Sequence, residues 1–375
     1  MDIDLSEDQV MLQDSTRRFV EDRASIAMLR KLVEEKRDMP LDAWRMAAEQ
    51  GWTALLIPEE FGGFSESAQG LVDAAIVAEE LGRVIYPGPF LSSAVAAYAI
   101  NDAGSSGQKA HWLPKLASGE AVVAWAMARR GGGGRIAGGG VRAAREGENL
   151  RLGGHAAYVL DAQIADAILV SVAGDDGATQ VLLTADTPGI TITPLDTLDV
   201  GRRIAHIDFA DVVVSTEALL GEIGAAGEAV ERQFQVALVL QCAETIGVVE
   251  RALEICLEYT NERLVFGRPV ASYQAIKHRL ADHATQLMGM KAAVAHAAKA
   301  VKDQASDAAI AASIAKSQCG KWGTEIVRDC MHMHGGIGMT WEHDIHFYGR
   351  RAVSNEALLG TPAAHHERLC RLAGL

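Results

Sequence analysis

"AVERQFQVALVLQCAETIGVVERALEICLEYTNERL", residues 229–264, carries apolar side chains along its whole length and contains few helix breakers. The pattern predicts one unusually long α-helix. Residues 273–301 and 308–331 show the same character, so two more long helices are expected. Helices of this length bury their apolar faces by packing side by side. The last part of the chain is therefore predicted to be a four-helix bundle.

The middle of the chain changes its period. Short runs rich in β-branched residues alternate there with Gly, Pro, Asp and Asn, which is typical of strands joined by turns. The runs are "AVVAWAMA" (121–128), "ADAILVSVA" (165–173), "QVLLTAD" (180–186), "ITITPL" (190–195) and "HIDFADVVV" (206–214). They predict an antiparallel β-barrel or sandwich. The tract "RRGGGGRIAGGG" (129–140) lacks the Lys-Ser/Thr ending of a phosphate-binding loop, so a hairpin loop is favoured.

The beginning of the chain is helical again. Ser6 and Gln9 have the spacing of a capping box, and residues 41–50 form a helical pattern that ends at Gly51. Two further helices are expected at residues 67–81 and 91–103. The predicted fold is an α+β multidomain protein with a helical domain (1–118), a β domain (119–222) and a helical bundle (223–375).

Composition narrows the possible partners. The net charge of −14 disfavours binding to nucleic acid or to an anionic membrane surface. No apolar run reaches membrane-spanning length, and the acidic start "MDIDLSEDQV" has no apolar signal region. Five separated cysteines without a CxxC motif indicate free thiols in a reducing compartment: Cys242, Cys256, Cys319, Cys330 and Cys370. We therefore expect a cytoplasmic protein that contacts neither nucleic acid nor membrane.

"MHMHGGIGMTWEHD" (331–344) allows two interpretations. A metal site would need His332, His334, His343 and His346 to converge, and the intervening glycines fix no such geometry. A cofactor turn explains the glycines, because Gly335 and Gly336 let the backbone approach a ligand closely. The cofactor turn is favoured, and no metal is expected.

Three motifs, in an order that follows the helical, β and helical regions, resemble the acyl-CoA dehydrogenase family. They are "GWTALLIPEEFGG" (51–63), "YTNERLVFGRPVASYQAIKHRLAD" (259–282) and "MHGGIGMTWEHDIHFYGRRA" (333–352). The nearest resemblance is to actinobacterial members that act on bulky acyl-CoAs such as steroid side chains. Several of those work as pairs of unlike subunits. The resemblance implies FAD as cofactor, an acyl-CoA substrate and electron-transfer flavoprotein as the acceptor.

The resemblance also implies a flavin site that reaches across a subunit interface, and hence a dimer or a tetramer. Arg263 is expected to neutralise the FAD pyrophosphate, and Phe266 to stack on or wall off an aromatic ring. Without the resemblance, a solvated arginine and a core phenylalanine would be the ordinary interpretations. The full set of implied cofactor-binding residues is Arg263, Phe266, Gln274, His332, Gly335, Gly336 and Thr361. His332 replaces the usual Gln before the Gly-Gly turn, and Val265 replaces the Gln or Thr before Phe-Gly.

The family's reaction, α,β-dehydrogenation of the thioester, needs a carboxylate base with a raised pKa. The two positions that the resemblance implies for it hold Leu359 and Ala237, which cannot ionise. Glu244 lies seven residues beyond Ala237, on the same helix face but about 10.5 Å further along. It is the first candidate, and a structural acid is an equal alternative. Glu356 is the second candidate, and a surface acid is the favoured alternative there.

Two functions remain open at this stage. The chain is either an FAD-dependent acyl-CoA dehydrogenase or a non-catalytic subunit that completes the flavin site of an unlike partner. The family's flavin segment in the middle domain corresponds here to "AWAMARRGGGGRIAGGG" (124–140), which keeps none of the usual polar side chains. Trp125 is a candidate wall for the flavin, with a core tryptophan as the ordinary alternative.

Overall fold

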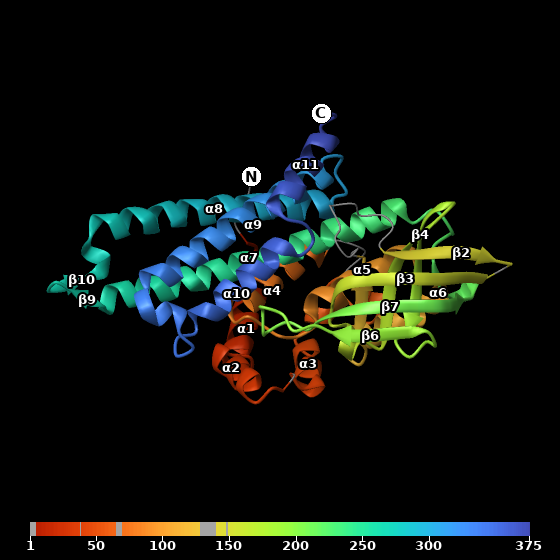
Figure 1. Cartoon of the computed structure of the whole chain (residues 1–375), viewed down its shortest axis with the longest axis horizontal. Coiled ribbons are helices and arrows are strands. Elements are labelled where there is room, and N and C mark those ends of the chain that lie inside the picture. The colour runs from red at the N-terminus through yellow and green to blue at the C-terminus, as the bar shows by residue number, and fades with distance from the viewer. Residues whose placement is uncertain (1–4, 38, 65–69, 128–139, 148) are drawn as a thin grey trace.

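The computed structural model describes residues 5–37, 39–64, 70–127, 140–147 and 149–375. A helical N-terminal part, a β-sheet and a helical C-terminal part follow one another along the chain (Figure 1). This confirms the predicted fold class. Among the described residues, no helix is both long enough and apolar enough to cross a membrane. All five cysteines are free thiols, as predicted.

The N-terminal part contains six α-helices within the described residues. The capping box of Ser6 and Gln9 starts the first helix as predicted. A second capping box, Ser105 with Gln108, starts a helix that the pattern analysis missed although its signal is in the sequence. The helices are α1(Glu7–Arg23), α2(Ile26–Glu34), α3(Leu41–Ala48), α4(Leu71–Arg83), α5(Phe90–Ala103) and α6(Ser106–Ala117).

The middle part is one sheet rather than a closed barrel. Within the described residues its strands are β1(Val123–Ala126), β2(Val141–Glu146), β3(Asn149–Leu160), β4(Ala167–Gly174), β5(Gly177–Thr184), β6(Ile190–Pro194), β7(Ile204–Val214) and β8(Leu219–Leu220). They are ordered β6-β7-β3-β2-β4-β5-β8, with β1 paired to β4. Most pairs are antiparallel, but β1 runs parallel to β4. The curled, open sheet fits the sandwich alternative of the prediction.

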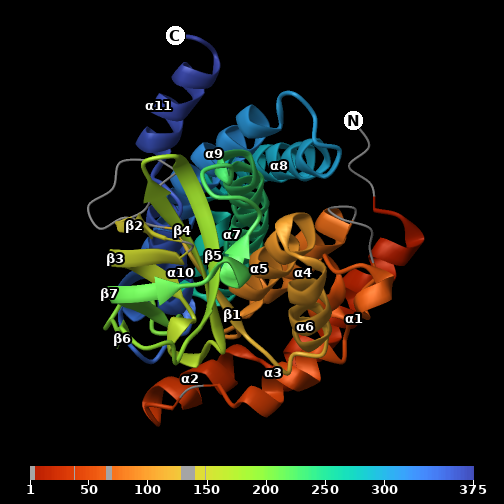
Figure 2. The same ribbon diagram turned by 90° about the vertical axis from the view of Figure 1, so that its right-hand side faces the viewer.

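The C-terminal bundle is built around α7(Gly227–Glu262), which packs against α4, α8(Gln274–Lys302), α9(Ala308–Met333) and α10(Ile345–Ala357). A short hairpin, β9(Leu264–Val265) and β10(Arg268–Pro269), connects α7 to α8. Figure 1 shows this hairpin at the end of the bundle that is far from the sheet. Figure 2 shows α11(Pro362–Leu372) projecting beside α9. The three long helices start and end within a few residues of their predicted limits.

Helices α4 and α7 cross with their backbones in contact. A Cβ atom added to Gly247 of α7 would lie 1.8 Å from the carbonyl oxygen of Glu79. A Cβ atom on Gly82 of α4 would lie 2.1 Å from the carbonyl oxygen of Glu244. Real non-bonded atoms do not approach so closely, so each helix needs glycine where the other passes. This crossing joins the N-terminal part to the bundle.

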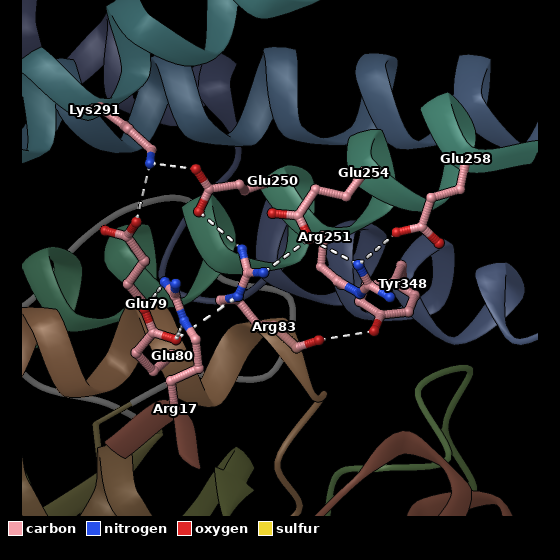
Figure 3. A network of polar contacts seen from close by, with 10 residues as sticks. All are labelled: Arg17, Glu79, Glu80, Arg83, Glu250, Arg251, Glu254, Glu258, Lys291 and Tyr348. Atoms are coloured by element: carbon pink, nitrogen blue, oxygen red, sulfur yellow. Dashed lines mark hydrogen bonds and ion pairs between the residues drawn. The ribbon is translucent and has the colours of Figure 1, made fainter. Parts of the chain in front are cut away.

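An ion-pair network extends from the same crossing (Figure 3). Arg83 of α4 donates to Glu250 at 3.0 Å and to Glu254 at 2.8 Å, both on α7. Its carbonyl oxygen accepts a hydrogen bond from the Tyr348 hydroxyl of α10 at 2.7 Å. Lys291 of α8 contacts Glu250 at 2.6 Å. The other members drawn in Figure 3 are Arg17, Glu79, Glu80, Arg251 and Glu258. Charged side chains thereby link four helices, and α10 joins them through the Tyr348 hydroxyl.

Candidate functional site

The far end of the bundle presents an aromatic ring to solvent. Val265 pairs with Arg268 across a two-residue turn made by Phe266 and Gly267, whose φ angles are +51° and +79°. Two positive φ values are typical of the tight turns that join twisted strands, although a phenylalanine is strained there. The Phe266 side chain is 95% exposed in the single chain. An exposed aromatic ring held by a strained backbone indicates a contact surface.

The predicted glycine turn lies beside this hairpin. It forms a 3-10 segment, η7(Gly335–Met339), directly after α9. The Tyr259 hydroxyl donates to the His334 carbonyl oxygen at 3.1 Å, and the two rings stack with their centroids 4.4 Å apart. Because Tyr259 is in the last turn of α7 and Arg263 caps that helix, the turn and the hairpin share one end of the bundle.

Most of the predicted cofactor-binding residues are exposed at this end: Arg263, Phe266, Gln274, His332, Gly335 and Gly336. A Cβ atom at Gly335 or Gly336 would meet nothing within 4 Å, so the backbone there is open to a ligand. A guanidinium, an exposed aromatic ring and an open backbone fit the pyrophosphate and aromatic parts of FAD. All three groups are exposed on the surface of the single chain, as expected for a site that is shared with another subunit.

Thr361 lies away from the end of the bundle that carries the hairpin and the glycine turn. Its hydroxyl accepts a hydrogen bond from the backbone of Ala364 at 3.3 Å and so caps α11. The adjoining Pro362 packs on Gly320 of α9. Gly320 is 15 residues before Gly335, which corresponds to about 22 Å along a helix. Thr361 therefore does not join the cluster at the end of the bundle.

The histidines of the same stretch pack the turn in place. His334 is buried, and its Nδ1 hydrogen-bonds the Cys330 carbonyl oxygen at 2.7 Å. The rings of His334 and His343 are 4.6 Å apart, while His346 stacks on Trp341. Burial lowers the pKa of all three histidines, so they are neutral near pH 7. Within the described residues, no three His, Cys, Asp or Glu side chains form a group that could hold a metal ion.

A largely apolar cavity lies on the sheet side of the molecule, at Leu359. This is one of the two positions that the family resemblance implies for the base. We call this space the Leu359 cavity; the part of it that water can occupy is about 40 Å³. It is lined by Leu91, Ser92, Trp125, Met127, residues 157–160, Leu358 and Leu359. Leu359 has a φ of +60°, and its carbonyl oxygen is 3.0 Å from Nε2 of His365. Burial lowers the pKa of His365 to about 4, so a neutral imidazole donates this hydrogen bond. No carboxylate is among the described lining residues.

Trp125 is held in this cavity wall by a chain of amides. Its indole nitrogen donates to Gln233 at 3.2 Å, and Gln233 exchanges hydrogen bonds with Gln180 at 2.7 Å. Tyr158 lines the cavity from β3 with a φ of +56° and is half exposed. The sequence analysis missed Tyr158 because it did not predict β3. Residues 128–139, most of the predicted flavin segment, lie outside the described residues.

Glu244 does not have the environment predicted for a base. Its carboxylate pairs with Arg202 and with Arg351, the latter at 2.6 Å, and accepts from the Asn355 amide at 3.2 Å. Burial alone would raise the pKa of Glu244, but the two arginines hold it below its usual value. A proton-abstracting group needs a raised pKa. Glu244 is therefore better explained as the centre of a buried ion-pair network.

Glu356, the second candidate, lies against α9. It is half-buried on α10, and its Cγ lies 3.7 Å from the position of a Cβ on Gly320 of α9. It is absent from the described lining of the cavity. Neither candidate acid is among the described residues that line the Leu359 cavity.

Lys316 is a buried cation beside Glu356. Only 2% of it is exposed, and its Nζ donates to the carbonyl oxygen of Asn355. Burial lowers the pKa of Lys316 from 10.5 to about 8. The unfolded chain therefore binds a proton between pH 8 and pH 10.5 that the folded chain has released.

This difference predicts that Lys316 makes the protein more stable as the pH rises from 8 to 10.5. The contribution is about 3 kcal/mol across the window. Lys316→Met should show a flatter profile, because it has no proton to lose there. Urea unfolding of both proteins at several pH values would measure this. Parallel profiles would contradict the assignment.

Comparison with known proteins agrees with this architecture. Residues 6–120 match the family described as "Acyl-CoA dehydrogenase, N-terminal domain", and residues 227–372 match "Acyl-CoA dehydrogenase, C-terminal domain". The acyl-CoA dehydrogenase IpdE2 of Mycobacterium tuberculosis is 33% identical over 97% of this chain and 96% of its own length. The chain belongs to the acyl-CoA dehydrogenase family. Members of this family are FAD-binding oxidoreductases that act on acyl-CoA.

Two solved structures resemble the chain over nearly its whole length. A variant of the Tcur3481-Tcur3483 steroid ACAD is 31% identical, with a TM-score of 0.89 over 98% of both chains. The ChsE4-ChsE5 complex from Mycobacterium tuberculosis is 26% identical, with a TM-score of 0.90 over 100% of this chain and 99% of that one. Both names join two different components.

Proposed function

We propose that this chain is one of two unlike subunits of an FAD-dependent acyl-CoA dehydrogenase, and that its partner supplies the catalytic base. One observation carries the proposal: the described lining of the Leu359 cavity has no carboxylate. The two candidate acids make other contacts: Glu244 pairs with two arginines, and Glu356 lies against α9.

The reaction sets clear requirements. A base must remove the α-proton of the thioester while hydrogen bonds stabilise the oxygen that gains charge. The chemistry that FAD supplies when bound is acceptance of the hydride from the β-carbon. In this chain, Trp125, Tyr158 and Leu359 line a largely apolar space, and the end of the bundle offers its exposed residues to a flavin shared with the partner. The described lining of the cavity thus has groups that bind and shield a substrate, but no carboxylate that could abstract a proton.

The paired names of the similar proteins support an assembly of unlike chains. By the same analogy, the acyl group is bulky and steroid-derived, and electron-transfer flavoprotein is the electron acceptor. The assembly is a tetramer packed on the bundles and works in the cytoplasm. Within it, the chain keeps three structural units, residues 1–118, 119–222 and 223–375.

Isolation of the tagged chain from its native host tests the proposal. We expect a stoichiometric second chain of the same family and a yellow preparation whose flavin is bleached by its acyl-CoA. A chain that purifies alone, binds one FAD per copy and reduces that flavin with acyl-CoA would refute it.

A homomeric enzyme with Glu244 as its base is the second candidate. It is favoured by one observation, since Glu244 lines a cavity that adjoins the Leu359 cavity. Glu244→Gln separates the two proposals because it removes basicity and keeps the side-chain volume. Flavin reduction that falls by several orders of magnitude, with FAD still bound, would favour the homomeric enzyme.

Arg263→Ala tests the proposed flavin contact at the end of the bundle. The guanidinium is exposed and has no ion pair among the residues that the structure describes, so the loss should appear in cofactor affinity rather than in folding. Removing a charge-assisted contact should weaken FAD binding by about 1.5–3 kcal/mol. Flavin release during dilution, followed by fluorescence, would measure it. Arg371→Ala, an exposed arginine on α11, is the matched control and should retain FAD normally.

A further inference from the structure

Three sulfur atoms lie together near the C-terminal ends of α7 and α9. The Cys256 thiol of α7 donates a hydrogen bond to Sδ of Met333 at 3.6 Å. The same Cys256 side chain also forms a hydrogen bond with the thiol of Cys330. Cys330 and Met333 are three positions apart on α9, so their side chains share one face of that helix. We call these three side chains the sulfur cluster.

The sulfur cluster lies just below the surface of the chain. Cys256 and Cys330 are each 0% exposed, whereas Met333 is half-buried, so the thioether is the outermost of the three groups. Both cysteines are free thiols. Met333 is the last residue of α9 and is followed closely by the glycine turn that starts at Gly335.

The charges near the cluster favour a cation. The carboxylate of Asp329 acts on both thiols, and it also pairs with Arg279 at 2.9 Å and with His283 at 2.8 Å. The hydrogen bond with Cys330 lowers the pKa of the Cys256 thiol, so Cys256 is the first of the two to lose its proton. A thiolate, rather than a thiol, is the form of cysteine that binds a metal ion.

The kinds of ligand indicate which metal fits. Within the described residues, no third His, Cys, Asp or Glu side chain joins the two thiols to make a metal-binding group. Structural zinc takes four ligands, and calcium and magnesium take oxygen ligands. Cysteine and methionine are the soft ligands that Cu(I) prefers. Three sulfur atoms placed around one ion with bonds of about 2.3 Å would be about 4 Å apart. The 3.6 Å between the sulfur atoms of Cys256 and Met333 is close to this spacing.

A second pair of buried thiols has a different electrostatic environment. Cys242 of α7 and Cys319 of α9 are also hydrogen-bonded to each other, and each is 1% exposed. The charged group that acts on both of them is the ammonium group of Lys316. A positive charge beside the pair opposes the binding of a metal cation. This second pair therefore provides an internal control for the sulfur cluster.

We propose that Cys256, Cys330 and Met333 bind one Cu(I) ion. The two thiols release their protons to solvent as two copper–thiolate bonds form, and the thioether sulfur donates a lone pair as the third ligand. No electron is transferred in this step. Because protons are released, the affinity should rise with pH. The bound ion would connect α7 to the last residue of α9, next to the glycine turn.

Titration of the purified protein with Cu(I) tests the proposal. Cys370 is exposed and could hold copper by itself, so every sample should carry Cys370→Ser. The titration is done without oxygen and in competition with bathocuproine disulfonate, a chelator that is coloured when it holds Cu(I). We expect the protein to withdraw one Cu(I) per chain from the chelator. X-ray absorption at the copper edge should show three sulfur neighbours at about 2.3 Å.

Variants assign the ion to the sulfur cluster. Cys256→Ala should abolish the retention of Cu(I), because Cys256 contacts both of the other sulfur atoms. Met333→Leu keeps the size of the side chain and should weaken binding at least about tenfold, the lower limit for losing even an outer contact of a metal site. It carries the test if Cys256→Ala does not fold. Cys319→Ala, in the second thiol pair, is the matched control and should retain Cu(I) normally.

Several results would overturn the inference. They are a parent protein that loses all Cu(I) to the chelator, a Cys256→Ala variant that binds as tightly as the parent, and a loss in Cys319→Ala as large as that in Cys256→Ala. Two sulfur neighbours instead of three, or unchanged affinity in Met333→Leu, would exclude the thioether and with it the three-sulfur site. None of these results bears on the proposed acyl-CoA function, which does not use the three sulfur atoms.

Discussion

Gly247→Ala should separate α4 from α7 and destabilise the protein by about 3 kcal/mol, the upper part of the range for overpacked sites. The added methyl group would lie 1.8 Å from the Glu79 carbonyl oxygen and 3.0 Å from the Arg83 backbone nitrogen. Both obstacles are backbone atoms of a helix, so a rotamer change cannot relieve the contact. Thermal unfolding followed by circular dichroism would measure the loss.

Gly289→Ala is the matched control for this prediction. Gly289 is also inside a long bundle helix, α8, but nothing lies within 4 Å of an added Cβ atom. Alanine should therefore stabilise the protein there by about 0.5–1 kcal/mol, through the lower conformational freedom of the unfolded chain. Gly82→Ala, on the other side of the crossing, should behave like Gly247→Ala. Unchanged stability in Gly247→Ala would show that the two helices can move apart freely.

The long helices were predictable because their signals are local. Apolar side chains at helical spacing and a lack of breakers define α7, α8 and α9 within a few residues. The same pattern shows Gly247 only as a residue of low helix propensity inside a helix. Its contact is with Glu79, 168 positions earlier in the chain, and no local pattern contains such a pairing.

The sheet was predicted less completely for a related reason. β3 contains Gly153 and Gly154, and a register shift relative to β7 occurs between Leu152 and Gly154. Glycines and irregular pairing weaken the alternation that identifies a strand. β2 carries charged residues along its exposed face, so it lacked an apolar run. By contrast, β4 was found from sequence because its buried residues form a continuous run.

The candidate site was likewise predictable where its residues are close in sequence, and not where they are distant in sequence. The exposed residues at the end of the bundle lie within two short motifs, so sequence alone brought them together. The role of Glu244 could not be predicted from its apolar neighbours on α7. Its partners Arg202 and Arg351 come from a loop before β7 and from α10, 42 and 107 positions away. An acid in an apolar run indicated only that some partner must exist.

Arg351→Met should be the most damaging substitution in this buried network. Arg351 is 1% exposed and serves two carboxylates, Asp199 and Glu244, as well as the Gly201 carbonyl oxygen at 3.3 Å. Removing one partner of a buried ion pair leaves the other charge buried without a partner, which lowers the free energy of unfolding by about 3–5 kcal/mol. Equilibrium unfolding in urea would measure the change. Arg350→Met, next in the chain with an exposed bond to Leu198, should lose about 1 kcal/mol or less.

The Glu244 carboxylate, which loses a partner in Arg351→Met, suggests how part of the lost stability can be recovered. Without Arg351, the carboxylate of Glu244 keeps only Arg202 and Asn355, so its pKa should rise from the lowered value it has now. Acidification below about pH 4.5 should then reduce the difference in unfolding free energy between Arg351→Met and the wild type. In the wild type, protonation of Glu244 removes its ion-pair stabilisation. In the variant, protonation removes an unfavourable buried charge. Adding Glu244→Gln to Arg351→Met should restore part of the stability at neutral pH for the same reason. A double variant that is no more stable than Arg351→Met would mean that Asp199, rather than Glu244, is the charge that Arg351 chiefly neutralises.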